Sequence, residues 1–172
     1  MRSESLEFLK NILSSPSPSG YEQPVQKIWR DYTGAFCDEV YTDPHGNAIG
    51  AVNKKGSPRI MFAGHCDEIG FLIRYIDEKG FISFGPIGGF DETIIPGRRV
   101  TIHTAKGPVS GVIGKTPIHL MKPDDRKKGA EINDLWIDIG ARDKKEAEET
   151  VSIGDPVTYQ YEMIELLGSR HA

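Results

Sequence analysis

Short apolar runs separated by glycine dominate the middle of this sequence, from Ile69 to about Tyr161. Runs of this length predict β-strands, because an amphipathic helix needs a longer periodic stretch than the glycine turns allow. The expected strands are residues 71–76, 81–84, 99–103, 108–113 and 135–138. Short strands at even spacing favour a small β-barrel, interrupted by one predicted helix over residues 144–150.

The first 68 residues follow a different pattern, in which helical periodicity precedes the strands. Leucine and isoleucine recur at helical spacing in residues 6–13, and Ser3 is placed to cap this predicted helix. Two prolines within residues 14–20 prevent its continuation. A second amphipathic stretch, residues 25–32, is predicted as a helix that Gly34 terminates.

Three strands are predicted after the two helices. Residues 39–42 and 48–52 form the first two around a turn, and the apolar run 59–63 forms the third. A continuous apolar run is expected of a strand that is buried on both faces. The predicted fold class is therefore α/β, with an N-terminal part of an α/β domain interrupted near residue 68 by a small β-rich, barrel-like domain.

Composition and charge exclude several classes of protein. The net charge of −4 over 172 residues argues against nucleic-acid binding, and the short basic run at residues 126–128 is interpreted as a solvated loop. No apolar run approaches the roughly 20 residues of a membrane helix, and the N-terminus has no signal-peptide core, so no membrane partner is expected. Two cysteines without CxxC spacing favour a cytoplasmic location.

His65 and Asp67 form the most informative pair, at the end of the apolar run 59–63, where α/β sheets commonly place ligand sites. Side chains two residues apart on extended backbone face the same way. A carboxylate that holds one imidazole nitrogen fixes the tautomer and leaves the other nitrogen for a metal ion. His65 is therefore a candidate metal ligand and Asp67 its orienting residue. Spacing alone leaves a surface pair or a structural histidine as alternatives.

The neighbouring cysteine and the other histidines are weaker candidates. Cys66 is expected to point away from the pair as a packed small residue, with a reactive thiol as the alternative. His45 lies in a predicted turn, and His103 alternates with apolar residues in a predicted strand. His119 follows a proline-broken turn and can project from a loop, whereas His171 lies next to the C-terminal residue.

Several motifs in order resemble one family. Residues 64–71, GHCDEIGF, resemble the first metal-binding motif of the glutamyl/deblocking aminopeptidases, a family also named cellulase M. Further resemblances lie at 17–22 (SPSGYE), 43–47 (DPHGN), 86–90 (PIGGF), 96–100 (PGRRV), 111–114 (GVIG), 117–119 (PIH), 135–141 (LWIDIGA) and 154–157 (GDPV). Each motif is loose alone, but their order and spacing cover nearly the whole chain.

The resemblance implies an α/β catalytic domain that is split by a β-rich dimerisation domain, here residues 1–68, 69–161 and 162–172. It implies that His65 binds one metal of a pair, usually zinc or cobalt, and that Asp67 orients His65. Such cytosolic enzymes remove N-terminal residues from peptides and often assemble from dimers into tetrahedral dodecamers. Any role of His119 would then be at a subunit interface.

The sequence departs from the family in one respect. No residue of this sequence matches four parts of the family's site: the bridging aspartate, the glutamate base, the further acidic ligands and the second histidine. Neither Glu68 nor Asp91 replaces them. Because a two-metal site needs several ligands, the chain alone is expected to bind metal weakly or not at all and to be inactive. A truncated chain, a natural fragment and completion by a second chain remain open.

Two other functions are consistent with the sequence. A non-catalytic oligomerisation module derived from this family is the first. A glycoside hydrolase is less favoured, because its chemistry needs a pair of carboxylates and no clear acidic pair is present. The predicted helices and strands of the split α/β domain lack their remaining layers, so the apolar run 59–63 is expected to expose an edge or face. Self-association, or disorder near the N-terminal segment, is expected to follow.

Overall fold

The structure is a computed structural model that describes residues 2–124, 129–168 and 170–171. The chain divides into two compact units. The N-terminal unit comprises Met1–Asp67 and Tyr161–Ala172, and the barrel unit comprises Glu68–Gln160. The basic run at 126–128 lies outside the described residues. Within the described residues, no helix has the length and apolarity needed to cross a membrane.

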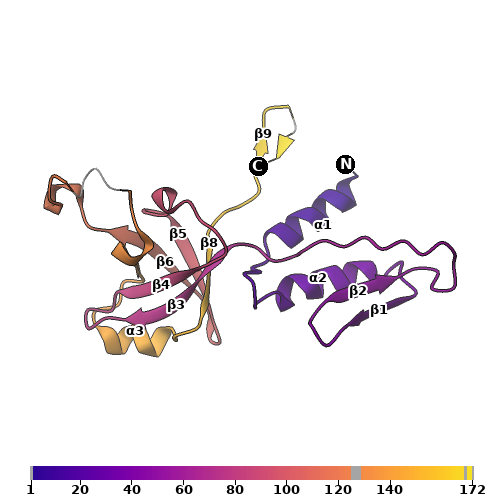
Figure 1. The fold of residues 1–172 in the computed structure, drawn as a ribbon, viewed down its shortest axis with the longest axis horizontal. Helices are drawn as coiled ribbons and strands as arrows, with labels where there is room; N and C mark the ends of the chain where they lie inside the picture. The colour runs from indigo at the N-terminus through magenta and orange to yellow at the C-terminus, as the bar shows by residue number, and fades with distance from the viewer. Residues whose placement is uncertain (1, 125–128, 169, 172) are drawn as a thin grey trace. The chain divides into compact units, whose positions relative to one another are not determined.

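Two helices open the N-terminal unit (Figure 1): α1 spans Ser3–Leu13 and α2 spans Gln23–Thr33. The rings of Phe8 and Tyr32 stack between them. The helix α2 ends at its C-cap, Gly34, as predicted, and Gly34 itself keeps a right-handed helical conformation with a φ of −58°. The predicted cap of α1 is wrong, since its N-cap is Arg2 and no side chain caps it.

A two-stranded antiparallel sheet follows, with β1 at Glu39–Thr42 and β2 at Ala48–Ala51. Asp43 holds the turn between them, because its Oδ1 accepts the backbone N–H groups of His45 and Asn47 at 2.9 Å each. These hydrogen bonds to the ionised form, led by the Asn47 side chain, lower the pKa of Asp43. The turn at 43–47 was predicted from the same residues.

The predicted strand at 59–63 is wrong. These residues belong to no strand of the described chain, and three of their side chains are exposed: Ile60 by 74%, Met61 by 87% and Phe62 by 95%. A strand that is buried on both faces needs neighbours on both sides. Within the described residues β1 and β2 pair only with each other, so the apolar run has no sheet to join. The predicted exposure of apolar surface is confirmed.

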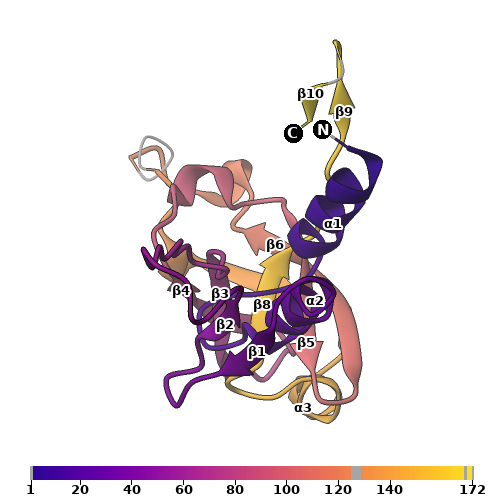
Figure 2. The same ribbon diagram turned by 90° about the vertical axis from the view of Figure 1, so that its right-hand side faces the viewer.

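Within the described residues, the barrel unit is a closed sheet of six strands in the order β3-β4-β7-β6-β5-β8, and all neighbours are antiparallel. Figures 1 and 2 label these strands except β7. The strands are β3 Gly70–Ile76, β4 Ile82–Ile87, β5 Arg99–Thr104, β6 Gly107–Lys115, β7 Leu135–Asp138 and β8 Pro156–Tyr159. The predicted barrel is confirmed. The strand β8, which closes it between β3 and β5, was not predicted.

The barrel has its own hydrophobic core. Phe71 is fully buried at its centre and meets the rings of Phe84, Phe90 and Tyr159. The helix α3, Lys144–Thr150, is capped by Asp143, whose side chain accepts the N–H of Glu146. The 3₁₀ turns in the described part of the unit are η1 Glu92–Ile94, η2 Ile118–Leu120 and η4 Ile132–Asp134. The strands β9 Glu165–Leu166 and β10 Arg170–His171 pair with each other and belong to the N-terminal unit.

Candidate metal-ligand site

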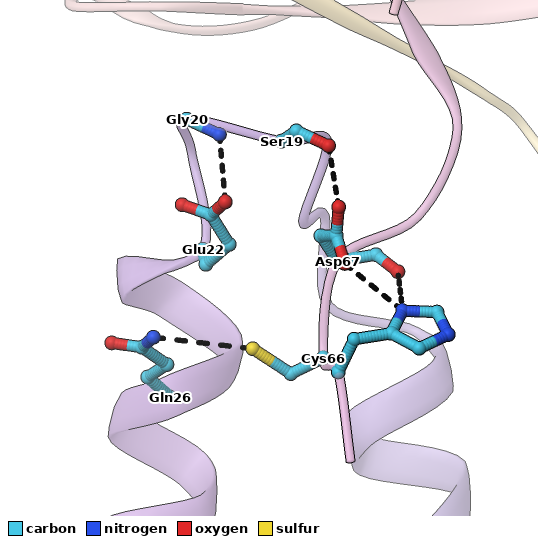
Figure 3. A network of polar contacts seen from close by, with 7 residues as sticks. Ser19, Gly20, Glu22, Gln26, Cys66 and Asp67 are labelled. Carbon is cyan, nitrogen blue, oxygen red and sulfur yellow. Dashed lines mark hydrogen bonds and ion pairs between the residues drawn. The ribbon is translucent and has the colours of Figure 1, made fainter. Parts of the chain in front are cut away.

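A tight turn before α2 positions the first residue of the site. The N–H of Tyr21 donates to the carbonyl oxygen of Pro18 at 2.7 Å, and Gly20 has a φ of +94°. A positive φ at the third position marks a type II β-turn, which glycine adopts without steric penalty. The N–H of Gly20 also donates to Glu22 Oε1 at 2.7 Å. The turn therefore holds Ser19, its second residue, beside Asp67 (Figure 3).

His65 and Asp67 contact each other as the sequence predicted. The Nδ1 atom of His65 lies 2.9 Å from Asp67 Oδ1 and 3.1 Å from the backbone oxygen of Asp67. Both oxygens only accept hydrogen bonds, so we assign the proton of the neutral imidazole to Nδ1. That tautomer leaves the lone pair on Nε2, which is the form that can bind a metal ion.

Asp67 has a second partner on its other oxygen. The hydroxyl of Ser19 donates to Asp67 Oδ2 at 2.5 Å. The hydrogen bond from Ser19, and then that from His65, lower the pKa of Asp67 because both favour the charged carboxylate. Asp67 is therefore ionised at neutral pH, and both of its oxygens are acceptors.

Cys66 points away from this pair. Its sulfur lies 3.9 Å from the Gln26 side-chain nitrogen on α2, as Figure 3 shows. The same nitrogen donates to the backbone oxygen of Gly46 at 2.8 Å. The alternation expected of extended backbone is thus present. The prediction that Cys66 is packed is wrong, because its side chain is exposed where no sheet covers the segment.

The pair leaves one imidazole nitrogen, His65 Nε2, without a partner from Asp67. The His65 side chain is 87% exposed, so its Nε2 can be reached from solvent. Across the described ranges, no three His, Cys, Asp or Glu side chains come together as a metal-binding group. The donor set therefore fits a single imidazole ligand with its orienting carboxylate. A tetrahedral zinc site needs further ligands.

Three of the other histidines have described side chains, one in the β1–β2 turn and two in the barrel unit. His45 lies in the β1–β2 turn, and His119 is exposed in η2. His103 lies on β5, half-buried, with its Nε2 2.9 Å from the hydroxyl of Thr158 on β8. Burial lowers the pKa of His103, and the negative charge of Glu68 opposes that shift.

Sequence reasoning missed Ser19 and Gln26 as neighbours of the site. Ser19 is 48 positions from Asp67 and Gln26 is 40 positions from Cys66, so no local spacing relates them. The sequence SPSG at 17–20 predicted a loop, and SPSGYE at 17–22 resembled the family, but neither indicated a partner for Ser19.

Comparison with known proteins identifies relatives over most of the chain. The lysyl aminopeptidase of Pyrococcus furiosus is 37% identical over 147 residues, which cover 83% of this chain and 42% of that protein. The TET aminopeptidase of Thaumarchaeota archaeon SCGC AB-539-E09 has a similar structure, with a TM-score of 0.93 at 37% identity over 98% of this chain and 48% of that one. The TET1 peptidase of Pyrococcus horikoshii, which can assemble into a tetrahedron or a large octahedral shell, has a TM-score of 0.84 at 37% identity over 95% of this chain and 48% of that one.

The fold is an α/β segment that carries a closed β-barrel, similar to the corresponding part of the TET aminopeptidase structure. The chain belongs to the M42 glutamyl aminopeptidase family, whose model matches residues 46–171. The predicted family and fold class are confirmed. The chain spans less than half the length of each of these three relatives.

Proposed function

We propose that the protein carrying this chain is a metal-dependent aminopeptidase that removes N-terminal residues from peptides. The observation that supports this most directly is the His65–Asp67 pair, which presents an imidazole in the tautomer that binds metal. The relatives named as lysyl and TET aminopeptidases support the peptide substrate. A cytoplasmic location is part of the proposal and rests on the two cysteines without CxxC spacing.

In this proposal His65 Nε2 holds one of two divalent metal ions, and Asp67 keeps the Nδ1–H pointing at its own carboxylate. Zinc and cobalt suit an imidazole ligand. When bound, a metal pair lowers the pKa of water and polarises the scissile carbonyl. The contribution of this chain is to present one nitrogen at a fixed orientation and to keep the counter-charge of Asp67 beside it.

The isolated chain is proposed to bind metal weakly. One exposed imidazole cannot replace the several ligands of a two-metal site. The remaining ligands would come from polypeptide outside these 172 residues, in keeping with the 42% of the lysyl aminopeptidase that the chain covers.

Self-association is proposed for the whole protein, as dimers or larger shells such as a dodecamer. The shells of the Pyrococcus horikoshii TET1 peptidase support it. The exposed Ile60, Met61 and Phe62 add apolar surface that an assembled protein would cover. Self-association alone, without chemistry, is the second candidate function, since the barrel has a complete core of its own.

Metal titration tests the role of His65. We expect zinc or cobalt to bind the 172-residue chain weakly, and His65→Ala to reduce the affinity by roughly tenfold or more. His119→Ala removes another exposed imidazole, and we expect it to leave the affinity unchanged. Equal affinity in His65→Ala and the unaltered chain would disprove the ligand. Two tightly held metal ions per chain would disprove weak binding.

Substrate tests separate the candidate functions. With the natural protein that carries this chain, we expect hydrolysis of aminoacyl anilides that a chelator abolishes, and no hydrolysis of a soluble cellulose derivative. Cellulose hydrolysis would instead support the glycoside hydrolase. Assembly without either activity would support the oligomerisation module.

A further inference from the structure

The two carboxylate oxygens of Asp67 are held from two sides. Its Oδ1 lies 2.9 Å from His65 Nδ1, and its Oδ2 accepts the hydroxyl proton of Ser19 at 2.5 Å. Figure 3 shows that Ser19 and Asp67 lie on two separate segments of the N-terminal unit and that their side chains point toward each other. The carboxylate therefore connects the turn before α2 to the imidazole.

Packing does little to hold this pair. The side chain of His65 is 87% exposed and that of Asp67 is 35% exposed. Residues 61–67 also lie in no helix or strand of the described chain. A hydrogen bond between exposed side chains is weak by itself, because water competes for both partners. A second hydrogen bond on the far oxygen restricts the rotation of the carboxylate.

Ser19 is itself held in place. It occupies the second position of the Pro18–Tyr21 turn, which is closed by a 2.7 Å backbone hydrogen bond. Glu22 adds a further contact by accepting the N–H of Gly20, next to Ser19. The hydroxyl of Ser19 therefore starts from a restrained backbone and does not have to be ordered by Asp67.

We propose that Ser19 is a positioning residue for the metal ligand His65. By holding Asp67 Oδ2, the hydroxyl orients Oδ1 towards the imidazole, which keeps the proton on Nδ1 and Nε2 free for a metal ion. The proposal rests on the proposed function of His65. It adds a third member to the pair: Ser19 donates to Asp67, and His65 donates to Asp67.

A role of Ser19 in the turn alone predicts something different. The second position of a type II turn accepts most residues, so alanine would leave the turn intact and the imidazole unchanged. A positioning role requires the hydroxyl. Ser19→Ala removes it, and Ser19→Thr keeps it. Ser15→Ala is the matched control, because it removes a serine hydroxyl from the same loop at a distance in sequence from the turn.

The first measurement is ¹H–¹⁵N NMR of the His65 ring in the full chain without metal, assigned with His65→Ala. We expect the Nδ1–H tautomer to predominate in the unaltered chain and in Ser15→Ala. In Ser19→Ala we expect a mixture with the Nε2–H tautomer, and in Ser19→Thr a return towards the original spectrum. An unchanged tautomer in Ser19→Ala overturns the proposal. A shift in Ser19→Ala that Ser19→Thr fails to reverse also overturns it.

The second measurement is titration with zinc alone. Loss of a partner that orients a metal-bound histidine typically weakens affinity 10–100-fold, and Ser19 acts one contact further away, so we expect a loss of about 3–10-fold in Ser19→Ala. Unchanged affinity in Ser19→Ala, alongside weaker binding in His65→Ala, overturns the role of Ser19 and leaves the ligand intact. Failure of His65→Ala to weaken binding overturns the proposed ligand, while the NMR result still decides whether Ser19 positions the ring.

Discussion

The barrel unit and the N-terminal unit differ in how they bury apolar surface. Among the described residues of the barrel, fourteen buried hydrophobic side chains form the core, and the closed sheet leaves no unpaired edge. In the described part of the N-terminal unit, the buried apolar side chains are Pro18 and Val25, while Met61 and Phe62 are almost fully exposed. The barrel therefore has the features of a self-sufficient folding unit, and the N-terminal unit does not.

The candidate site lies in the unit with less burial. Its geometry depends on hydrogen bonds from a turn and a helix, through Ser19 and Gln26, and not on close packing. Polar contacts between exposed groups are individually weak, since water competes for them. Changes in the barrel should thus affect stability strongly, whereas changes near the site should affect orientation more than stability.

The largest expected effect is a difference in the loss of stability between two phenylalanine-to-alanine substitutions, one in each unit. Phe71→Ala removes a fully buried ring from the barrel and should destabilise it by about 3–5 kcal/mol, through lost burial and the cavity that remains. Phe62→Ala removes a ring that is 95% exposed and should change stability by less than about 0.5 kcal/mol.

The two tryptophans allow each unit to be followed separately. Trp136 lies on β7 of the barrel, and Trp29 lies on α2. Urea unfolding monitored by Trp136 in a Trp29→Phe background reports the barrel, and the reverse background reports the N-terminal unit. Equal losses for Phe71→Ala and Phe62→Ala would contradict the difference between the units.

Sequence patterns predicted the helices and strands that are determined by the spacing of apolar residues within the segment itself. The strand β7 and the helix α3 have the predicted bounds, because alternation and helical spacing record which side chains face a core. The strand β8 was missed because its four residues, PVTY, begin with proline and have little alternation. The run 59–63 was mistaken for a strand because apolar composition cannot show which neighbours will cover it.

In the candidate site, too, the local contact was predictable from the sequence and the long-range contact was not. His65 and Asp67 are two residues apart, so extended backbone brings their side chains together, and the 2.9 Å contact follows from that spacing. Their metal-binding role stays a prediction. The contact of Ser19 with Asp67 crosses 48 positions and depends on how the chain folds back, which no short motif encodes.

The second effect concerns two glycines with positive φ, one in each unit. At Gly80, with φ +85°, an added Cβ would lie 2.9 Å from the backbone oxygen of Asp143. At Gly20, with φ +94°, no atom lies within 4 Å of the added Cβ. Gly80→Ala therefore combines backbone strain with a clash and should cost about 2 kcal/mol or more in barrel stability.

Gly20→Ala has backbone strain alone, so its cost should be about 1–2 kcal/mol at most and should appear in the Trp29 signal. The Trp136 signal serves as its control and should not change. If Gly20→Ala proved more damaging than Gly80→Ala, the turn before α2 would be more tightly restrained than the barrel, and the contrast between the units would fail.

The smallest effect is a pH dependence confined to the barrel. Burial lowers the pKa of His103 in the folded state, against an ordinary unfolded value of about 6.5. As pH falls through about 6.5, the unfolded chain takes up a proton before the folded barrel does, so the barrel loses stability. Above that pH both states are neutral at His103 and the effect is absent.

His103→Gln keeps a side chain that can hydrogen-bond Thr158 but removes the titration. We expect urea midpoints from Trp136 to decline less between pH 7 and pH 5 in His103→Gln than in the unaltered chain. Both proteins should have the same dependence between pH 7 and pH 8. An equal decline in both proteins below pH 7 would show that His103 charges as readily in the barrel as in the unfolded chain, and that the core next to β5 and β8 is less closed than its burial indicates.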